Sequence, residues 1–193
     1  MKGILLISGG FDSAVAGYLL KNKLDLIGLH FSYEPFTDKN PEIKSKDVCD
    51  ILKIKKFMSI NIWKDIENIS NRCGQRYYFI LSKRLMFKKA EEIARQEGAE
   101  FIITGESLAQ VSSQTLENLY CIDQAVKIPV LRPLIGFNKD EIIDIAKKIG
   151  TYEVCIGPEV CDVLGPKHPL TKANIIRVEE EEKLYGNLSW KEW

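Results

Sequence analysis

Short apolar runs alternate along the chain with longer segments in which apolar residues recur at helical spacing. Short runs of this kind, flanked by polar or glycine-containing stretches, are typical of strands buried on both faces of a parallel sheet. We predict five strands, at residues 2–7, 25–32, 56–62, 100–104 and 128–134. The segments between them predict helices at residues 13–22, 65–71, 77–97 and 139–149, and one more that follows a polar loop at 33–41 and ends at Leu52. This alternation predicts an α/β fold with a parallel five-stranded sheet, helices on both faces, and ligands at the carboxyl ends of the strands.

A glycine-containing hexapeptide, SGGFDS, directly follows the first predicted strand and leads into the first predicted helix. Gly9 and Gly10 allow backbone N–H groups to approach a ligand closely, and the helix N-terminus adds partial positive charge. Ser8 and Ser13 supply hydroxyl donors, and Asp12 is placed where Mg²⁺ is held against phosphate oxygens. The segment therefore predicts a phosphate-binding loop rather than an ordinary strand-to-helix turn.

This loop lacks the lysine that the Walker motif GxxxxGK[ST] places on the β- and γ-phosphates. A loop without that lysine is suited to holding pyrophosphate as a unit, which favours cleavage of ATP into AMP and pyrophosphate. The hexapeptide resembles the pyrophosphate-binding loop of the PP-loop ATPases (N-type ATP pyrophosphatases), enzymes that activate a carbonyl oxygen by adenylation. The resemblance implies a PP-loop ATPase fold of the Rossmann-like, adenine nucleotide alpha-hydrolase-like type.

Length, charge and cysteine content limit the remaining possibilities. The 193 residues predict a single PP-loop domain over 1–193, with a cysteine-bearing loop and a final helix appended at 151–193. Lys and Arg balance Asp and Glu at 27 each, so no overall field favours nucleic acid or a membrane, although basic residues cluster at 53–56 and 83–89. No apolar run has membrane-spanning length, no signal peptide precedes the first strand, and the odd number of five cysteines argues against a secreted disulfide scaffold. We therefore expect a cytoplasmic protein.

Two further predicted strand ends carry candidate nucleotide-binding residues. His30 and Phe31 end the second strand, where a purine ring could stack or accept backbone hydrogen bonds; both could equally be ordinary sheet-end residues. Gly105 follows the fourth strand and lets backbone approach a ligand. The polar run at 110–115 comes next and includes Gln114, which we assign to the same nucleotide site.

Lys139 is the most informative lysine in the sequence. Asn138 and Glu141 form a plausible capping box, which places Lys139 in the first turn of a helix. A surface lysine is common at such a position. A lysine that faces the phosphate loop, however, would stabilise the charge that builds on the α-phosphate during adenyl transfer.

The Pro- and Gly-rich loop at 151–170 carries Cys155, Cys161 and His168. A thiol in such a loop of a nucleotide-activating enzyme can carry sulfur as a persulfide or thiolate. A zinc site is an alternative, although the spacing matches no zinc finger and no fourth ligand is evident. Cys49 and Cys121 lie in apolar contexts and are predicted to be buried structural residues. We predict that Thr171 caps a final, glutamate-rich helix.

Taken together, these stretches resemble the catalytic PP-loop domain of the tRNA 4-thiouridine synthetases. The matching stretches occur in the family's order and cover most of the chain: SGGFDSAVA, LHF, KRLMFKKAEEIA, ITGESLAQVSSQTLENL, RPLIGFNKDEII and PEVCDVLGPKHPLT. The loop alone is shared by many PP-loop enzymes, whereas GESLAQVSSQTLENL is much more specific.

The resemblance implies an ATP-dependent sulfurtransferase. ATP adenylates the C4 oxygen of a uridine in tRNA, pyrophosphate leaves, and persulfide sulfur displaces AMP to give 4-thiouridine. By match of motif, Asp12 is the loop aspartate and the Mg²⁺ ligand, Lys139 the catalytic lysine, and Cys161 the cysteine that delivers sulfur. Cys155 has no matching role in the family.

The family also carries an RNA-binding THUMP region and, in some members, a rhodanese-like domain, and neither is found in this sequence. We therefore expect tRNA to be recognised through a separate THUMP-type protein or an oligomer, with sulfur from a donor protein or sulfide. Phe79 and Ser82 stand where some archaeal members carry a CxxC pair. Two alternatives stay open: thiolation or amidation of a small molecule, and a non-catalytic ATP-binding subunit of a modification complex.

Overall fold

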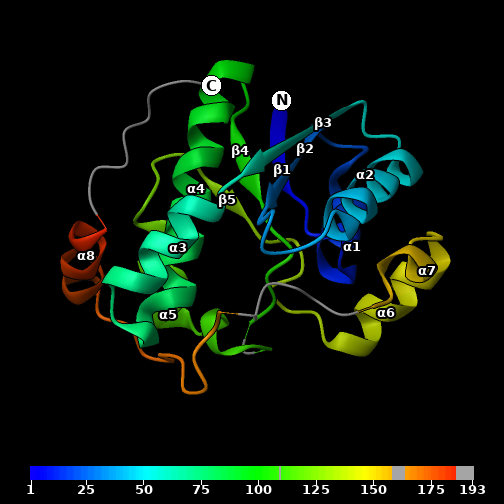
Figure 1. The fold of residues 1–193 in the computed structure, drawn as a ribbon. Coiled ribbons are helices and arrows are strands. Elements are labelled where there is room, and N and C mark those ends of the chain that lie inside the picture. Colours follow the sequence, from blue (N-terminus) through cyan, green and yellow to red (C-terminus); the bar gives the residue numbers. More distant parts are fainter. Residues whose placement is uncertain (109, 158–163, 186–193) are drawn as a thin grey trace.

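The computed structural model describes residues 1–108, 110–157 and 164–185, and it contains the predicted parallel sheet (Figure 1). Five strands pair in the order β3-β2-β1-β4-β5, all in parallel. Their bounds are β1 Lys2–Leu6, β2 Asp25–Ser32, β3 Lys56–Asn61, β4 Phe101–Ile103 and β5 Val130–Leu131. The α/β prediction is confirmed, and each predicted strand is present, with β4 and β5 shorter than the apolar runs that predicted them.

The strand order places a topological switch point beside β1. The chain builds outward from β1 through β2 to β3, and then crosses to the other side of β1 to add β4 and β5. The register pairs Leu6 with Leu29 and Leu5 with Ile103, so the carboxyl ends of the three central strands meet at one edge. In open α/β sheets, ligands bind in the crevice at this edge and at the switch point.

Helices cover both faces of the sheet, as predicted. Figure 1 shows α3, α4, α5 and α8 on one side, and α1, α2, α6 and α7 on the other. Their bounds are α1 Phe11–Leu20, α2 Asn40–Leu52, α3 Trp63–Arg72, α4 Tyr78–Glu97, α5 Leu116–Asp123, α6 Lys139–Lys148, α7 Tyr152–Cys155 and α8 Ile175–Leu184, with short 3₁₀ turns at Gln75–Tyr77 and Ser112–Gln114. The sheet is therefore buried on both faces, as its continuous apolar strands require.

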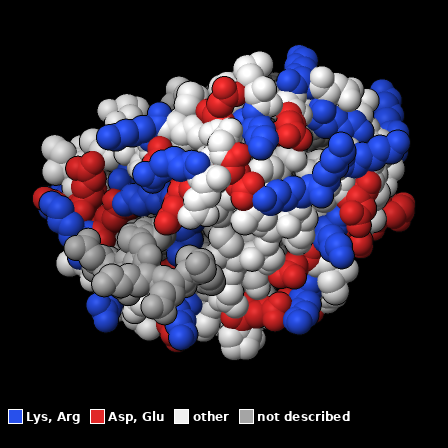
Figure 2. Space-filling model, turned by 90° about the horizontal axis from the view of Figure 1, so that it is seen from above, with Lys and Arg blue, Asp and Glu red and all other residues white. Residues whose placement is uncertain are grey.

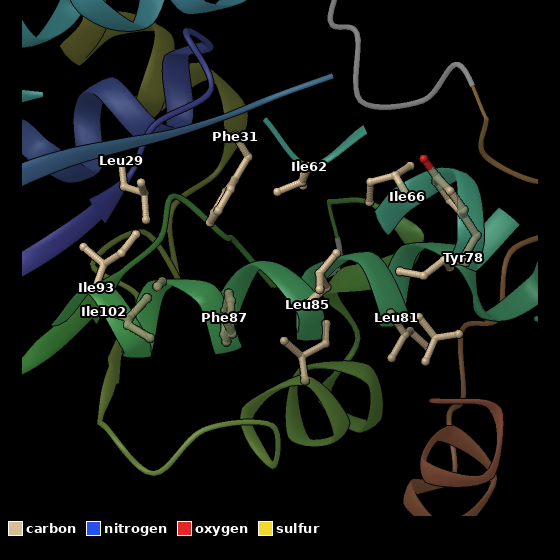
Figure 3. Packing of buried hydrophobic residues seen from close by; sticks show 14 of the residues in the cluster. Leu29, Phe31, Ile62, Ile66, Tyr78, Leu81, Leu85, Phe87, Ile93 and Ile102 are labelled. Carbon is tan, nitrogen blue, oxygen red and sulfur yellow. The ribbon is translucent and has the colours of Figure 1, made fainter. Parts of the chain in front are cut away.

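The larger apolar cluster lies between α4 and the sheet. In Figure 3, Leu29 and Phe31 of β2 point toward α4, whose Leu85 and Phe87 face the same core. Phe87 is fully buried and packs with the rest of this cluster. The α4 helix is long and ends at Gly98, which adopts the left-handed conformation. Because of its length it spans this face of the sheet, and it positions its side chains at the ligand-binding edge.

Three local predictions were incomplete or wrong. The sequence did not indicate α5, which begins after Thr115, whose hydroxyl accepts a hydrogen bond from the Asn118 N–H. The segment expected to be a loop from residue 151 contains the short helix α7. Thr171 does not cap the last helix; Asn174 does, through its side-chain oxygen, and the Thr171 carbonyl instead accepts from the Thr115 hydroxyl.

Charged side chains of both signs are mixed over the surface that Figure 2 displays, where Lys and Arg alternate with Asp and Glu. The basic cluster at 83–89 on α4 is paired rather than free. Its ion pairs are Lys83–Glu106, Arg84–Glu182, Lys88–Glu182 and Lys89–Asp65. Within the described ranges, no helix combines the length and apolar character needed to cross a membrane.

Candidate functional site

The glycine loop lies at the carboxyl end of β1, between Leu6 and the start of α1 at Phe11. Gly10 is the N-cap of α1 and no side chain caps this helix, so its first N–H groups face the ligand edge. Two serines brace the loop: the Ser13 hydroxyl accepts from the Ser8 N–H at 3.3 Å and donates to the Gly10 carbonyl at 3.1 Å. These hydrogen bonds fix the conformation of the loop and leave the N–H groups at the start of α1 available to an anion.

Two glycines of the site are required by close contacts. Gly9 has φ +78°, and a Cβ there would lie 2.8 Å from the Lys44 Cβ. A Cβ on Gly105 would lie 2.5 Å from the Asp12 carbonyl carbon and 2.6 Å from the Ser13 nitrogen. Gly105 was assigned to close approach of a ligand; in the structure its Cα packs against the backbone of the glycine loop itself. The strand end after β4 thus supports the loop directly.

Asp12 and Lys139 meet although they lie far apart in the sequence. The Lys139 Nζ lies 3.0 Å and 3.3 Å from the two carboxylate oxygens of Asp12, and 5.8 Å from the centre of the Phe11 ring. The predicted capping box of Asn138 and Glu141 is present and starts α6 at Lys139. The helix start therefore directs this lysine to the glycine loop, and both side chains remain partly exposed to a ligand.

A smaller cavity of about 130 Å³ lies between the ends of β1 and β2. Its walls include Ile7, His30, Phe31 and Met86, and most of its lining is apolar. His30 is buried, and its Nδ1 lies 3.0 Å from the Ile7 carbonyl and 3.1 Å from the Ser45 hydroxyl. Burial lowers the pKa of His30 below 6.5, which keeps the imidazole neutral near pH 7. Such a cavity suits a flat, uncharged ring.

A larger cavity of about 600 Å³ adjoins the smaller one, and the two share Leu6, Ser8 and Met86. Residues of the glycine loop form part of its wall, and the others come from α4, from residues 104–114 and from residues 165–169. Of the predicted nucleotide-binding residues, Ser8, Asp12, Ser13, Gly105 and Gln114 line this cavity, and Ser8, His30 and Phe31 line the smaller one. The structure thus brings residues from distant stretches of sequence to one connected space.

Gln114 has an unsatisfied acceptor in this cavity. The side chain is buried, and its Oε1 has no hydrogen-bond partner among the residues that the structure describes. Buried polar atoms are nearly always paired, so an orphaned amide oxygen in a cavity wall indicates a donor that arrives with a ligand.

A buried ionic network that the sequence did not reveal borders the larger cavity. Glu106 accepts from the Lys83 ammonium at 2.5 Å and from Arg132 at 2.8 Å, and Arg132 also pairs with Asp123 at 2.6 Å. Burial would raise the pKa of Glu106, but the two adjacent cations outweigh it and lower the pKa, which keeps this carboxyl ionised. Arg132 lies within the predicted fifth strand and follows β5 in the structure, and nothing in the sequence indicated its carboxylate partners.

Lys44 of α2 is a second residue that sequence reasoning missed. Its aliphatic stem packs against Gly9 of the glycine loop, and its Nζ donates to the Ile156 carbonyl at 2.6 Å. Ile156 follows α7 and lies just before the segment that carries Cys161. Lys44 therefore connects the glycine loop to the start of that segment.

The cysteines that the structure describes are all buried. Cys49 and Cys121 are buried, as predicted, and Cys155 is also buried, which raises the pKa of its thiol to about 11. Cys161 lies outside the described residues. Within the described ranges, no three or more His, Cys, Asp or Glu side chains are grouped to hold a metal ion.

Comparison with known proteins places the chain in a family. The family model "Thiamine biosynthesis protein (ThiI)" matches residues 1–185. The chain belongs to the ThiI family. It is 43% identical to a probable tRNA sulfurtransferase of Moorella thermoacetica over 94% of its length, and 42% identical to that of Halothermothrix orenii over 97%. It spans about half of each relative, 48% and 49% respectively.

Solved structures give the same result at the level of the fold. A 4-thiouridine synthetase, solved in complex with RNA and bound ATP, superposes with a TM-score of 0.90 and 37% identity over 95% of this ThiI-family chain and 50% of its own. An NH3-dependent NAD synthetase of Campylobacter jejuni superposes with a TM-score of 0.61 at 18% identity, over 80% of this chain and 66% of its own. The second likeness establishes the shared PP-loop ATPase fold alone.

Proposed function

We propose that this ThiI-family domain is an ATP-dependent tRNA sulfurtransferase that adenylates a uridine and replaces its C4 oxygen with sulfur. The observation that carries the proposal is the meeting of Asp12 and Lys139 at a lysine-free glycine loop, beside a cavity large enough for a second substrate. The likeness to a 4-thiouridine synthetase solved with RNA and ATP supports the same chemistry.

The nucleotide has a natural position in this site. The flat apolar cavity at the ends of β1 and β2 takes adenine, with the backbone of His30 and Phe31 along its wall. The phosphates reach the glycine loop, where N–H groups of the α1 N-terminus receive them. Gln114 supplies an acceptor for a nucleotide hydroxyl or amino group.

Asp12 and Lys139 have different electrostatic roles: Asp12 binds Mg²⁺, and Lys139 stabilises charge on the α-phosphate. Mg²⁺ in phosphate sites prefers one or two carboxylates together with phosphate oxygens, and Asp12 offers such a carboxylate at the loop. The ion would neutralise charge on the leaving pyrophosphate. Lys139 stabilises the negative charge that builds on the α-phosphate as the uridine oxygen attacks; its ammonium lies beside Asp12 at the glycine loop, which supports this role.

Sulfur transfer follows adenylation. The terminal sulfur of a Cys161 persulfide attacks C4 and AMP leaves; a second thiol then cleaves the S–S bond, so that sulfur stays on the base and the protein is left with a disulfide for an external reductant. Cys155 is a weak candidate for that second thiol, because it is buried and the pKa of its thiol is raised to about 11. The donor for this step is a persulfide-bearing protein, which passes its terminal sulfur atom to the Cys161 thiolate and keeps its own thiol. Sulfide is the alternative donor; it would attack the adenylated C4 directly and displace AMP without a persulfide.

Product analysis tests the proposal. With ATP, Mg²⁺, a sulfur donor, tRNA and a THUMP-type partner, the protein should release AMP and pyrophosphate, and mass spectrometry of digested tRNA should detect 4-thiouridine. Asp12→Asn should abolish both products while leaving the fold intact, since this partly exposed carboxylate packs little surface. Cys161→Ser should lose thiolation and keep AMP formation. Release of ADP and phosphate would refute the proposal, and AMP without any change in tRNA would favour a small-molecule substrate.

We further propose that the domain works in the cytoplasm with tRNA presented by a THUMP-type region, on a separate protein or on an oligomer. The equal numbers of Lys and Arg (27) and of Asp and Glu (27) support this proposal, because a chain without net positive charge attracts RNA phosphates only weakly.

A further inference from the structure

The larger cavity has an apolar wall that ATP binding leaves unexplained. Phe79 of α4 forms part of this wall, together with Pro166 and Pro169. Phe79 is partly buried, and its ring lies 5.4 Å from that of Tyr78, centre to centre, in a T-shaped arrangement. Phe87, which lines the same cavity, is instead fully buried in the core. Phe79 is thus an aromatic side chain that packs against Tyr78, in a cavity wall that also contains charged and polar residues.

The two prolines belong to a segment, residues 164–174, that is fixed to the body of the domain. The Asn118 side chain donates to the Leu170 carbonyl at 2.7 Å and accepts from the Ala173 N–H at 3.0 Å. The Leu170 N–H in turn donates to the Arg76 carbonyl at 3.1 Å. These bonds hold the segment next to the start of α4, three residues from Phe79.

Two exposed cations lie close in sequence to the residues of this apolar wall. Arg76 precedes Phe79, and Lys167 lies between the two wall prolines; both are exposed. Neither is within ion-pair distance of a carboxylate among the residues that the structure describes, in contrast to the paired lysines of α4. Free exposed cations beside an aromatic surface are the arrangement by which proteins hold single-stranded nucleic acid, with bases stacked and phosphates on Lys and Arg.

We propose that Phe79 is the stacking surface for an unpaired pyrimidine of an RNA substrate, and that Arg76 and Lys167 bind the phosphates beside it. This inference rests on the proposed function and adds where the target base lies. An enzyme that acts on a base within a folded RNA must take it out of its stack, and the base then needs an aromatic or apolar surface in the pocket. Because the same cavity is lined by Asp12 and Ser13, a base on Phe79 shares one space with the phosphate loop.

The test measures binding of a short RNA hairpin with one unpaired uridine, in the presence of a non-hydrolysable ATP analogue and at low salt. A hairpin with an abasic position in place of the uridine is the matched probe. The wild-type protein should prefer the uridine hairpin. Phe79→Ala should weaken uridine-hairpin binding by about 5- to 150-fold, the range for loss of one base stack, and remove the preference, while Phe79→Tyr retains both.

ATP-analogue affinity reports on the nucleotide site and should be unchanged in Phe79→Ala, which also shows that the variant folds. Phe36→Ala, an exposed aromatic stacked on Trp63, is the matched control and should bind both hairpins normally. Arg76→Ala combined with Lys167→Ala should weaken both hairpins alike and reduce the slope of log affinity against log salt by about 1.4. Arg177→Ala, an exposed arginine paired with Glu180, should not.

Three results would overturn the inference: unchanged hairpin binding in Phe79→Ala, a parallel loss of ATP-analogue affinity, or competition by free uridine as effective as by the hairpin. Binding is separate from chemistry in this design. Uridine-selective, Phe79-dependent binding without any 4-thiouridine would sustain the inference and refute the proposed function. Normal 4-thiouridine formation by Phe79→Ala would sustain the proposed function and refute the inference about Phe79.

Discussion

At the scale of single residues, Gly105 shows how the absence of a side chain builds the site. Its Cα lies so close to the glycine loop that a Cβ would stand 2.5 to 2.7 Å from backbone atoms of Asp12 and Ser13. Backbone cannot rotate aside as a flexible side chain can, so any larger residue at this position must displace the loop.

We therefore expect Gly105→Ala to weaken ATP binding at least tenfold and to lower the free energy of unfolding by about 1–3 kcal/mol, as overpacking commonly does. Calorimetric titration with ATP and urea unfolding measure the two effects. Gly136→Ala is the control, because a Cβ there would meet nothing within 4 Å, and both quantities should stay near wild type. Equal behaviour of the two variants would contradict this account of the loop.

His30 predicts a pH dependence of stability. Burial lowers the pKa of His30 in the folded protein below its unfolded value of 6.5. Between these two pKa values His30 is protonated in the unfolded chain and neutral in the folded chain, so acid favours unfolding. The free energy of unfolding should fall as the pH drops from about 7 toward 5.5. His30→Gln should flatten this part of the profile, because it removes the imidazole that titrates there. Urea unfolding at a series of pH values gives the slopes.

Asp12, Lys139 and the glycine loop could be predicted from the sequence because their signals are local: a hexapeptide after a strand, and a capping box. Lys44 could not, because its partner Ile156 is 112 residues away. The Lys83–Glu106–Arg132 network was hidden for the same reason. Its members look like ordinary surface charges until the sheet places strand ends side by side.

At the scale of elements, α8 is attached to α4 by charge as much as by apolar packing. Arg84 is buried and donates to Glu182 at 2.8 and 3.2 Å, and it also donates to the Cys121 carbonyl; Lys88 pairs with the same carboxylate. Burial would raise the pKa of Glu182, but hydrogen bonds from both cations lower it. Removing the carboxylate charge would leave a buried guanidinium without compensation.

Glu182→Gln should accordingly reduce the free energy of unfolding by about 3–5 kcal/mol. Glu180→Gln, on the exposed side of the same helix, should change it by no more than about 0.5 kcal/mol, because an exposed ion pair with Arg177 contributes little. Denaturant unfolding of the Glu182→Gln and Glu180→Gln variants measures both changes in the free energy of unfolding. A Glu182→Gln protein as stable as its Glu180→Gln counterpart would mean that α8 is held by apolar contacts alone.

Long elements were predicted better than short ones. The α4 helix has a sustained amphipathic pattern and a glycine stop, and β2 was predicted with the bounds that the structure shows. The α5 and α7 helices are short and depend on tertiary contacts: α5 packs against α4, and α7 against α2 and α6. Their sequences carry turn signals as well as helix signals, so local propensity alone did not settle their form.

At the scale of the whole molecule, positive and negative charges are equal in number. Lys and Arg number 27, as do Asp and Glu, and the basic residues of α4 are engaged by carboxylates. We expect this chain alone to bind tRNA weakly, because its Lys and Arg are matched by equal numbers of Asp and Glu. That binding should depend strongly on salt, because it rests on contacts with phosphates. Titrations of tRNA at several salt concentrations check this, and a partner with a THUMP region should tighten binding. Tight, salt-insensitive binding by this chain would contradict the expectation.

The position of β1 in the middle of the sheet has a consequence for how the domain folds. The first strand of this chain pairs on one side with β2 and on the other with β4, where Gly3 meets Phe101. Until β4 has been synthesised, a β3-β2-β1 sheet presents β1 as an open edge, able to recruit strands from other chains. The glycine loop follows this edge strand and lacks the backbone support of Gly105 until the same moment. We therefore expect the proposed nucleotide binding to begin only after β4 has been synthesised and has paired with β1.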